Sequence, residues 1–196
     1  MALVNALGVY VLLAAWSAGS WWVFAAMLVV VVTLDYIYFT KKHTLPAKYI
    51  APGVVFLLTF TLYLVSGMRS LSLVGLGGDE PHYLVITHSL LADHDLQIEN
   101  NHTQKDYRWF YGGELRPDYL VRGLNGAIYS IHAPGLPALL VPGYALWGVH
   151  GAVATMALLG ALAAMAMFDT ACRVAGRGVG WATWAVTDRK STRLNS

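Results

Sequence analysis

Residues Gly151–Cys172 read GAVATMALLGALAAMAMFDTAC, an apolar stretch whose single charge, Asp169, lies near its end. About 20 predominantly apolar residues are enough for a helix to cross the hydrocarbon core of a bilayer. We therefore predict a membrane-spanning helix here. Arg173 and Arg177 follow directly, and basic residues are enriched in cytoplasmic loops, which predicts that this span runs from outside to inside.

The composition of the whole chain agrees with a membrane protein. Of its 196 residues, 57% are hydrophobic and 12% are charged, whereas soluble domains are about 25% charged. The expected fold is therefore all-α, a polytopic bundle of transmembrane helices. The net charge of +2 and the absence of a basic stripe argue against a nucleic-acid partner. Cys172 is the only cysteine, so no disulfide or cysteine-based metal site can form within the chain.

Further spans are expected before the first acidic motif. Tyr49–Ser66 predicts one span that leads outward, and the loop before it reads as cytoplasmic because it holds Lys41, Lys42 and Lys48. Met1–Leu34 contains no charge. We predict a tight helical hairpin, Leu3–Trp16 and Trp21–Phe39, with one long tilted helix as the alternative.

Pro134–Val149 is also apolar, but it is short for a span and contains Pro137 and Pro142. Apolar stretches near this length are often interfacial or re-entrant. Counting it as a span would also place Arg173 outside. We therefore predict a broken helix that lies in the outer membrane interface.

The ionisable residues gather in one segment between the spans. Eight of the eleven acidic residues and five of the seven histidines lie between Asp79 and His132. The segment opens with Gly77–Leu84, GGDEPHYL. Aspartate followed by proline in the first turn predicts a helix start, and the apolar spacing extends this helix to Leu91. Ionisable groups near a bilayer are costly unless they have a function, so Asp79 and Glu80 are candidate catalytic residues, although Asp79 could serve only as the helix cap.

Other polar residues of this segment offer weaker signals. Arg116 and Arg122 flank Asp118, and arginine suits bidentate phosphate binding, although one of them could simply pair with Asp118. Leu124–Tyr129 contains an Asn-Gly pair that predicts a β-hairpin turn. The histidine spacing matches no metal signature, so no dedicated metal site is expected. The histidines of the segment are His82, His88, His94, His102 and His132.

The last residues, Asp188–Ser196, read DRKSTRLNS. This peptide is the translation of GAT CGG AAG AGC ACA CGT CTG AAC TCC, a widely used sequencing adapter. We expect this segment to be an artefact and exclude it from fold reasoning. The natural chain would then continue beyond Thr187, and Gly178–Val186 would begin a further span.

The order of these elements resembles the N-terminal part of GT-C-type glycosyltransferases. A span is followed by GDEPHYL, a polar segment, the His132–Pro137 element HAPGLP, and a span that ends in arginine. The most similar groups are the protein O-mannosyltransferases and the aminoarabinose transferase-like enzymes, including RgtA/B/C/D-like proteins. The resemblance covers roughly Tyr49–Val186. Two features depart from the family pattern: the additional apolar segments before Tyr49, and Ile131, which stands where relatives carry a glutamate.

The resemblance implies a multi-pass enzyme of the inner (plasma) membrane that transfers a sugar from a polyprenyl-phosphate carrier to a lipid, glycan or protein acceptor. It implies that the loop is extracytoplasmic and that Asp79, with Glu80 beside it, is the general base. The departing phosphate requires a cation, for which His132, Arg116 and Arg122 are candidates. The sequence does not identify a cofactor, and a divalent metal remains one option.

The expected domain organisation follows from this reading. Residues 1–78 form N-terminal transmembrane helices, 79–149 the extracytoplasmic loop with interfacial helices, and 150–187 further transmembrane helices, the last of them truncated. The alternative is a non-catalytic or transport-type polytopic protein of envelope glycan assembly. Transporters place charges inside their spans, whereas here the spans are nearly free of charge and most carboxylates lie in the loop, which favours the enzyme.

Overall fold

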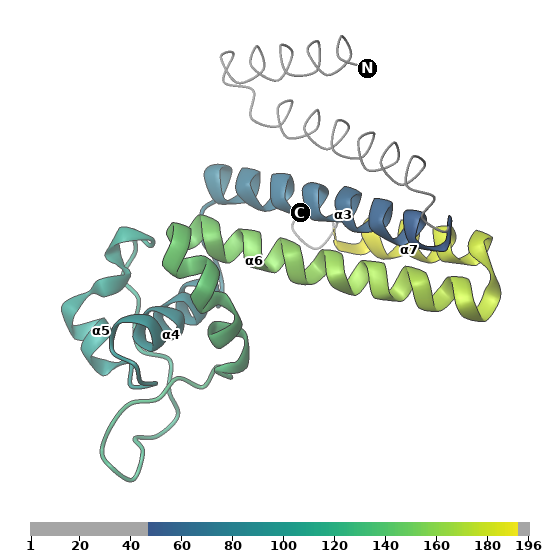
Figure 1. Cartoon of the computed structure of the whole chain (residues 1–196). Helices are drawn as coiled ribbons and strands as arrows, with labels where there is room; N and C mark the ends of the chain where they lie inside the picture. The colour runs from purple at the N-terminus through teal and green to yellow at the C-terminus, as the bar shows by residue number, and fades with distance from the viewer. Residues whose placement is uncertain (1–46, 192–196) are drawn as a thin grey trace. The chain divides into compact units, whose positions relative to one another are not determined.

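The computed structural model describes residues 47–191, with side chains from 51 to 186. The described part is mostly helical and contains no β-strand. The N-terminal segments expected at Leu3–Trp16 and Trp21–Phe39, and the lysine-rich loop up to Pro46, lie outside the described residues. The helices, shown in Figure 1, are α3 (Ala47–Leu73), α4 (Glu80–Ala92), α5 (Glu99–Gln104), the short 3-10 helix η1 (Asp106–Trp109), α6 (Gly135–Ala175) and α7 (Arg177–Ser191).

Two helices are long and apolar enough to cross a membrane. They are α3, over Ala51–Leu73, and α6, over Gly135–Ala175. The predicted segments Tyr49–Ser66 and Gly151–Cys172 lie inside these two helices. The α7 helix extends to Ser191, so its described backbone includes the first residues of the expected adapter segment.

The described chain forms two compact units. One unit combines the N-terminal part of α3 up to Ser66 with the chain from Ala157 onward, and the other comprises Gly67–Met156. We call them the helical unit and the loop unit.

Aromatic and small residues pack the helical unit. Gly160 lies against the Tyr63 ring, so α3 and α6 approach closely there. The Phe168 ring of α6 packs edge-on against Trp181 of α7, with ring centroids 4.9 Å apart. Trp184 of α7 donates a hydrogen bond from Nε1 to Thr59 Oγ1 of α3, at 2.8 Å. This bond satisfies a buried hydroxyl in an otherwise apolar bundle.

Helix α4 is central to the loop unit and is packed on two sides. Val85 and Ile86 belong to one buried cluster, together with Ile98, Tyr107, Leu115 and Ile128. Leu84 belongs to a second cluster with Leu140, Tyr144, Val149 and Ala152 of α6. The helix begins and ends where the sequence predicts. Its apolar residues are covered by protein on both sides, however, and do not form a single apolar stripe open to a membrane.

Helix α6 is interrupted at Trp147 and Gly148, where the backbone leaves the helical region, and its ribbon changes direction there (Figure 1). Gly148 has φ +56° and ψ −137°, a conformation that glycine alone adopts without strain. A helix is therefore present at Gly135–Leu146, inside the predicted segment Pro134–Val149. The break lies at Gly148, and not at Pro137 or Pro142.

Immediately after the break, the two parts of α6 cross in close contact. A Cβ added to Gly143 would lie 2.6 Å from the carbonyl oxygen of Gly151. Only two glycines allow backbones to approach this closely. This crossing fixes the first part of α6, and hence the end of the polar loop, against the second part.

The Asn-Gly turn is present, but the hairpin is not. Gly123 N donates to Ala127 O at 2.9 Å, and Gly126 has a positive φ of 78°. Beyond the turn the chain pairs with an earlier segment: Ile98 N donates to Ile128 O, and Gln97 and Tyr129 form an isolated antiparallel bridge. The predicted hairpin is therefore wrong in its pairing, because residues 128–129 pair with residues 97–98.

Candidate functional site

The GGDEPHYL motif forms a glycine turn and the first turn of α4. Asp79 is the N-cap residue and Pro81 lies in the first turn, as predicted, but the Asp79 side chain makes no capping hydrogen bond. Glu80 makes the local contact instead, since its Oε2 accepts a hydrogen bond from Gly77 N at 3.1 Å. Asp79 is exposed and, among the described residues, its carboxylate has no hydrogen-bond partner. The Asp79 carboxylate therefore makes no hydrogen bond that stabilises the described part of the fold.

A second pair of residues reaches the same region from the polar loop. Ile131 N donates to Asp118 O at 3.0 Å, and His132 N donates to the Ser130 side chain. The bond between Ile131 and Asp118 holds two distant stretches of the loop next to each other. As a result, His132 Nε2 lies 3.3 Å from Asp118 Oδ2.

His82, one turn after Asp79, completes the cluster. Its ring centroid lies 5.4 Å from that of His132. Tyr83 covers the other histidine, with ring centroids 4.9 Å apart. One metal-ligating atom from each of His82, Asp118 and His132 lies within 4.8 Å of the others. We refer to these three residues as the His–Asp–His cluster.

Burial and neighbouring charges act on His82 in opposite directions. Burial lowers the pKa of His82 below its usual value of 6.5, and His132 acts in the same sense, whereas Asp118 and Asp79 raise it. The interaction with Asp79 places this carboxylate within electrostatic range of the cluster. Near pH 7 the His82 imidazole is therefore mainly neutral, with a lone pair available on one nitrogen.

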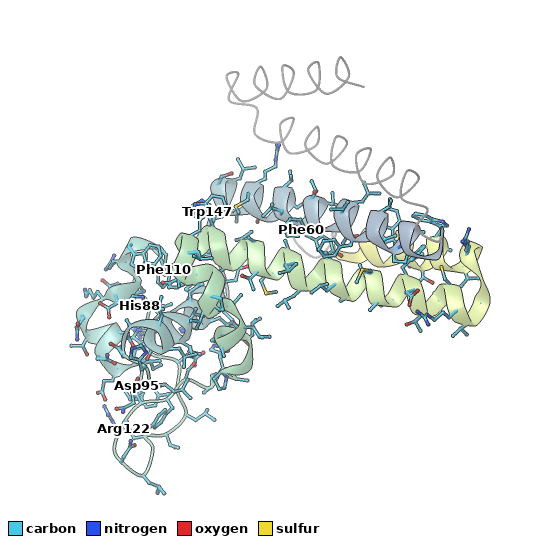
Figure 2. The ribbon with its side chains drawn as sticks, in the orientation of Figure 1. Phe60, His88, Asp95, Phe110, Arg122 and Trp147 are labelled. Atoms are coloured by element: carbon cyan, nitrogen blue, oxygen red, sulfur yellow. The ribbon has the colours of Figure 1, made fainter. Side chains whose placement is uncertain are left out.

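The two predicted arginines occupy different environments. Arg122 makes a bidentate ion pair with Glu99, with N–O distances of 2.8 and 2.7 Å, and also donates to Gly126 O. In Figure 2 it lies on the extended loop of this unit. Arg116 is exposed and has no ion-pair partner among the described residues. Neither arginine forms the ion pair with Asp118 that we considered, because Asp118 faces His132.

Most other carboxylates of the loop hold the fold together. Asp93 accepts hydrogen bonds from the side chains of Asn100 and Asn101. Asp95, labelled in Figure 2, accepts from Ser89 Oγ and Gln97 N. The remaining structural carboxylates are Glu99, paired with Arg122; Asp106, bound by Asn101; and Glu114, bound by Lys105, Tyr107 and Arg108. Asp79 and Asp118 are therefore the two aspartates available for another role.

The structure thus joins some predicted site residues and separates others. His132 lies beside His82 in the first turn of α4, which begins after Asp79, and Glu80 is turned toward the preceding glycine turn. His82 and Asp118 are site residues that the sequence did not single out. His82 could have been found, because it lies one helical turn from Asp79, but nothing in the local sequence links Asp118 to either.

Comparison with known proteins adds no further assignment. No protein-family model, curated protein or solved structure matches the chain.

Proposed function

We propose that the chain is the N-terminal part of a multi-pass membrane glycosyltransferase that takes a sugar from a polyprenyl-phosphate carrier, with Asp79 as the general base. One observation carries this proposal. The Asp79 carboxylate is exposed, has no hydrogen-bond partner among the described residues and lies one helical turn before His82 of the His–Asp–His cluster. A carboxylate positioned in this way can accept the proton of an attacking hydroxyl.

The membrane setting is supported by the position of the site along the chain. The apolar helix α3 ends at Leu73, and α4 begins at Glu80 after a short glycine-containing turn. A site so close to the end of an apolar helix suits a carrier whose chain stays in the bilayer while its phosphate reaches the polar loop. The proposed enzyme is a multi-pass protein of the inner (plasma) membrane, with its loop unit outside the cytoplasm.

The leaving phosphate gathers negative charge, which a nearby cation must stabilise. His132 and Arg116 are the better candidates of the predicted set. Arg116 is unpaired among the described residues, and His132 belongs to the cluster beside Asp79. Arg122 is the weaker candidate, because Glu99 already neutralises it in a bidentate pair. Binding phosphate there would first require that this pair be broken.

The test begins with a long read across the codon for Thr187, to obtain the complete reading frame. The encoded protein is reconstituted in liposomes with polyprenyl-phosphate-linked radiolabelled sugars, and sugar transfer is measured together with release of polyprenyl phosphate. We expect Asp79→Asn to lower the rate by about 10²-fold or more, as loss of a general base does. Membrane insertion should be unchanged.

Asp169→Asn is the matched control, because this aspartate pairs with Arg173 in the helical unit and is not a member of the cluster. It should transfer sugar at the wild-type rate. Full activity of Asp79→Asn would refute the catalytic role. Movement of the lipid-linked sugar across the bilayer without transfer would instead support a transport-type protein, and a reading frame that stops near Ser196 would refute the enzyme.

A further inference from the structure

One buried polar atom of the His–Asp–His cluster has no hydrogen-bond partner among the described residues. His132 is only 10% exposed, and its Nε2 is buried without a hydrogen-bond partner. The atom lies 3.3 Å from Asp118 Oδ2, yet the alignment is not that of a hydrogen bond. An unpaired buried polar atom is rare in a folded protein, because it costs the full desolvation penalty.

The chemistry of the three groups indicates what is missing. A neutral imidazole presents a lone pair on one nitrogen, and a carboxylate presents only acceptors. A cation at this point would accept a lone pair from the His132 ring and another from the Asp118 carboxylate, and it would satisfy both atoms. His82 is a second imidazole in the same place, with a ligand atom within 4.8 Å of those of His132 and Asp118, so a single metal ion could engage all three groups.

We propose that the His–Asp–His cluster binds a divalent transition-metal ion, with one ligand atom each from His82, Asp118 and His132. The spacing fits this assignment. Around a tetrahedral zinc ion with bonds of about 2.0–2.1 Å, ligand atoms lie roughly 3.3 Å apart. The His132 Nε2–Asp118 Oδ2 distance of 3.3 Å already has this value, and no pair of the three ligand atoms exceeds 4.8 Å.

The surroundings of the cluster hold its ligands in position. Tyr83 packs on the His132 ring, and α4 fixes His82, with its first turn anchored by Pro81, which is buried. The hydrogen bond from Ile131 N to Asp118 O joins the backbones that carry the two other ligands. Outer contacts that orient metal ligands are a regular part of metal sites.

Three protein ligands leave a coordination position open. Sites with two imidazoles, one carboxylate and an open position are typical of catalytic zinc rather than structural zinc. Asp118 is 40% exposed, so the cluster is accessible from solvent. A water molecule or an anionic oxygen can therefore fill the fourth position. The binding of the ion itself does not depend on the glycosyltransferase proposal.

The test uses the full chain without a polyhistidine tag, purified in detergent, stripped with EDTA and dialysed against Zn²⁺. Metal content is measured by mass spectrometry and affinity by competition with a chromogenic chelator. We expect one Zn²⁺ per chain. Asp118→Asn, His82→Asn and His132→Gln should each weaken binding by more than the ~10–100-fold that follows loss of an outer contact. Co²⁺ loaded in place of Zn²⁺ should give the visible absorption of a four-coordinate ion.

His94→Asn is the matched control. His94 lies in the same unit, is absent from the cluster and has φ +61°, a backbone conformation that asparagine tolerates well. It should bind zinc as the wild type does. Asp118→Asn is the decisive variant, because its exposed, isosteric side chain leaves the fold intact, as circular dichroism would verify. Stoichiometric binding that survives Asp118→Asn, an equal loss in His94→Asn, or no binding by the wild type would overturn the proposal.

Discussion

The close crossing of the two parts of α6 makes a sharp prediction about Gly143. The added Cβ of Gly143→Ala would lie 2.6 Å from the carbonyl oxygen of Gly151. Carbon atoms in ordinary contact are about 3.5–4.0 Å apart, so the two segments must separate by roughly 1 Å. The Thr155 hydroxyl oxygen would lie closer still and can rotate away, whereas the Gly151 carbonyl belongs to the backbone and cannot.

The expected cost follows from two opposing effects. Overpacking of a well-packed site costs about 1–3 kcal/mol, and a backbone-to-backbone clash belongs at the upper end, about 3 kcal/mol. Alanine in a helix gains about 1 kcal/mol over glycine. The net expectation is a loss of about 2 kcal/mol in the free energy of unfolding. The cost arises from loss of packing around Tyr144 and Leu140, which lie in the same part of α6.

Gly135→Ala provides the comparison within the same helix, because a Cβ there would meet nothing within 4 Å. This variant should be as stable as the wild type or slightly more stable. The assay is denaturant unfolding of the full chain in detergent micelles, followed by circular dichroism. Equal unfolding free energies for Gly143→Ala and Gly135→Ala would show that the close crossing does not exist.

Two further predictions concern the helical unit and the pH dependence of stability. Thr59→Val should lower the free energy of unfolding by about 1 kcal/mol, because the Trp184 Nε1–H loses its acceptor in an apolar setting. Thermal unfolding should show this loss. The control Thr170→Val should show almost no loss, because the Thr170 hydroxyl bonds Ala166 O of its own helix. Burial lowers the pKa of His102 below 6.5, with His82 acting in the same sense and a hydrogen bond to Leu115 O opposing it. The unfolded chain therefore binds this proton more readily, so stability is full above pH 6.5 and falls as the pH drops below it, by at most about 1.4 kcal/mol per pH unit. Unfolding curves between pH 5 and 7.5 should show a weaker slope for His102→Gln, and an unchanged slope would contradict the assignment.

Local signals in the sequence predicted the elements that depend on local physics. The start of α4 follows from Asp79 and Pro81, because capping and a fixed proline φ act within one turn. The break in α6 was expected from its prolines, but it lies at Gly148. Pro137 falls in the first turn of the helix, where no backbone donor is lost. The backbone at the break has a positive φ, which glycine adopts readily. Gly148, inside the apolar run, was therefore the informative residue.

The candidate site could be predicted only in part, because its members meet through tertiary contacts. His132 and Asp79 were found through the order of motifs, but the approach of Asp118 depends on its hydrogen bond with Ile131 N. Similarly, Arg122 was considered as a partner of Asp118, and it pairs with Glu99. Which acid pairs with which base is decided by the path of the loop, and no short-range pattern encodes it.

The two proposals assign separate tasks to the two aspartates that the fold leaves available. Asp118 would hold the metal, and Asp79, which is outside the cluster, would accept the proton of the attacking hydroxyl. The Asp79 and Asp118 variants should therefore differ in zinc binding and in sugar transfer. Asp79→Asn should keep zinc and lose sugar transfer, because the ligands are intact and the base is gone. Asp118→Asn should lose zinc. It should also lose sugar transfer only if the metal ion stabilises the negative charge of the leaving phosphate. Loss of zinc in Asp79→Asn would mean that this carboxylate is itself a ligand, and it would then not be free to act as the base.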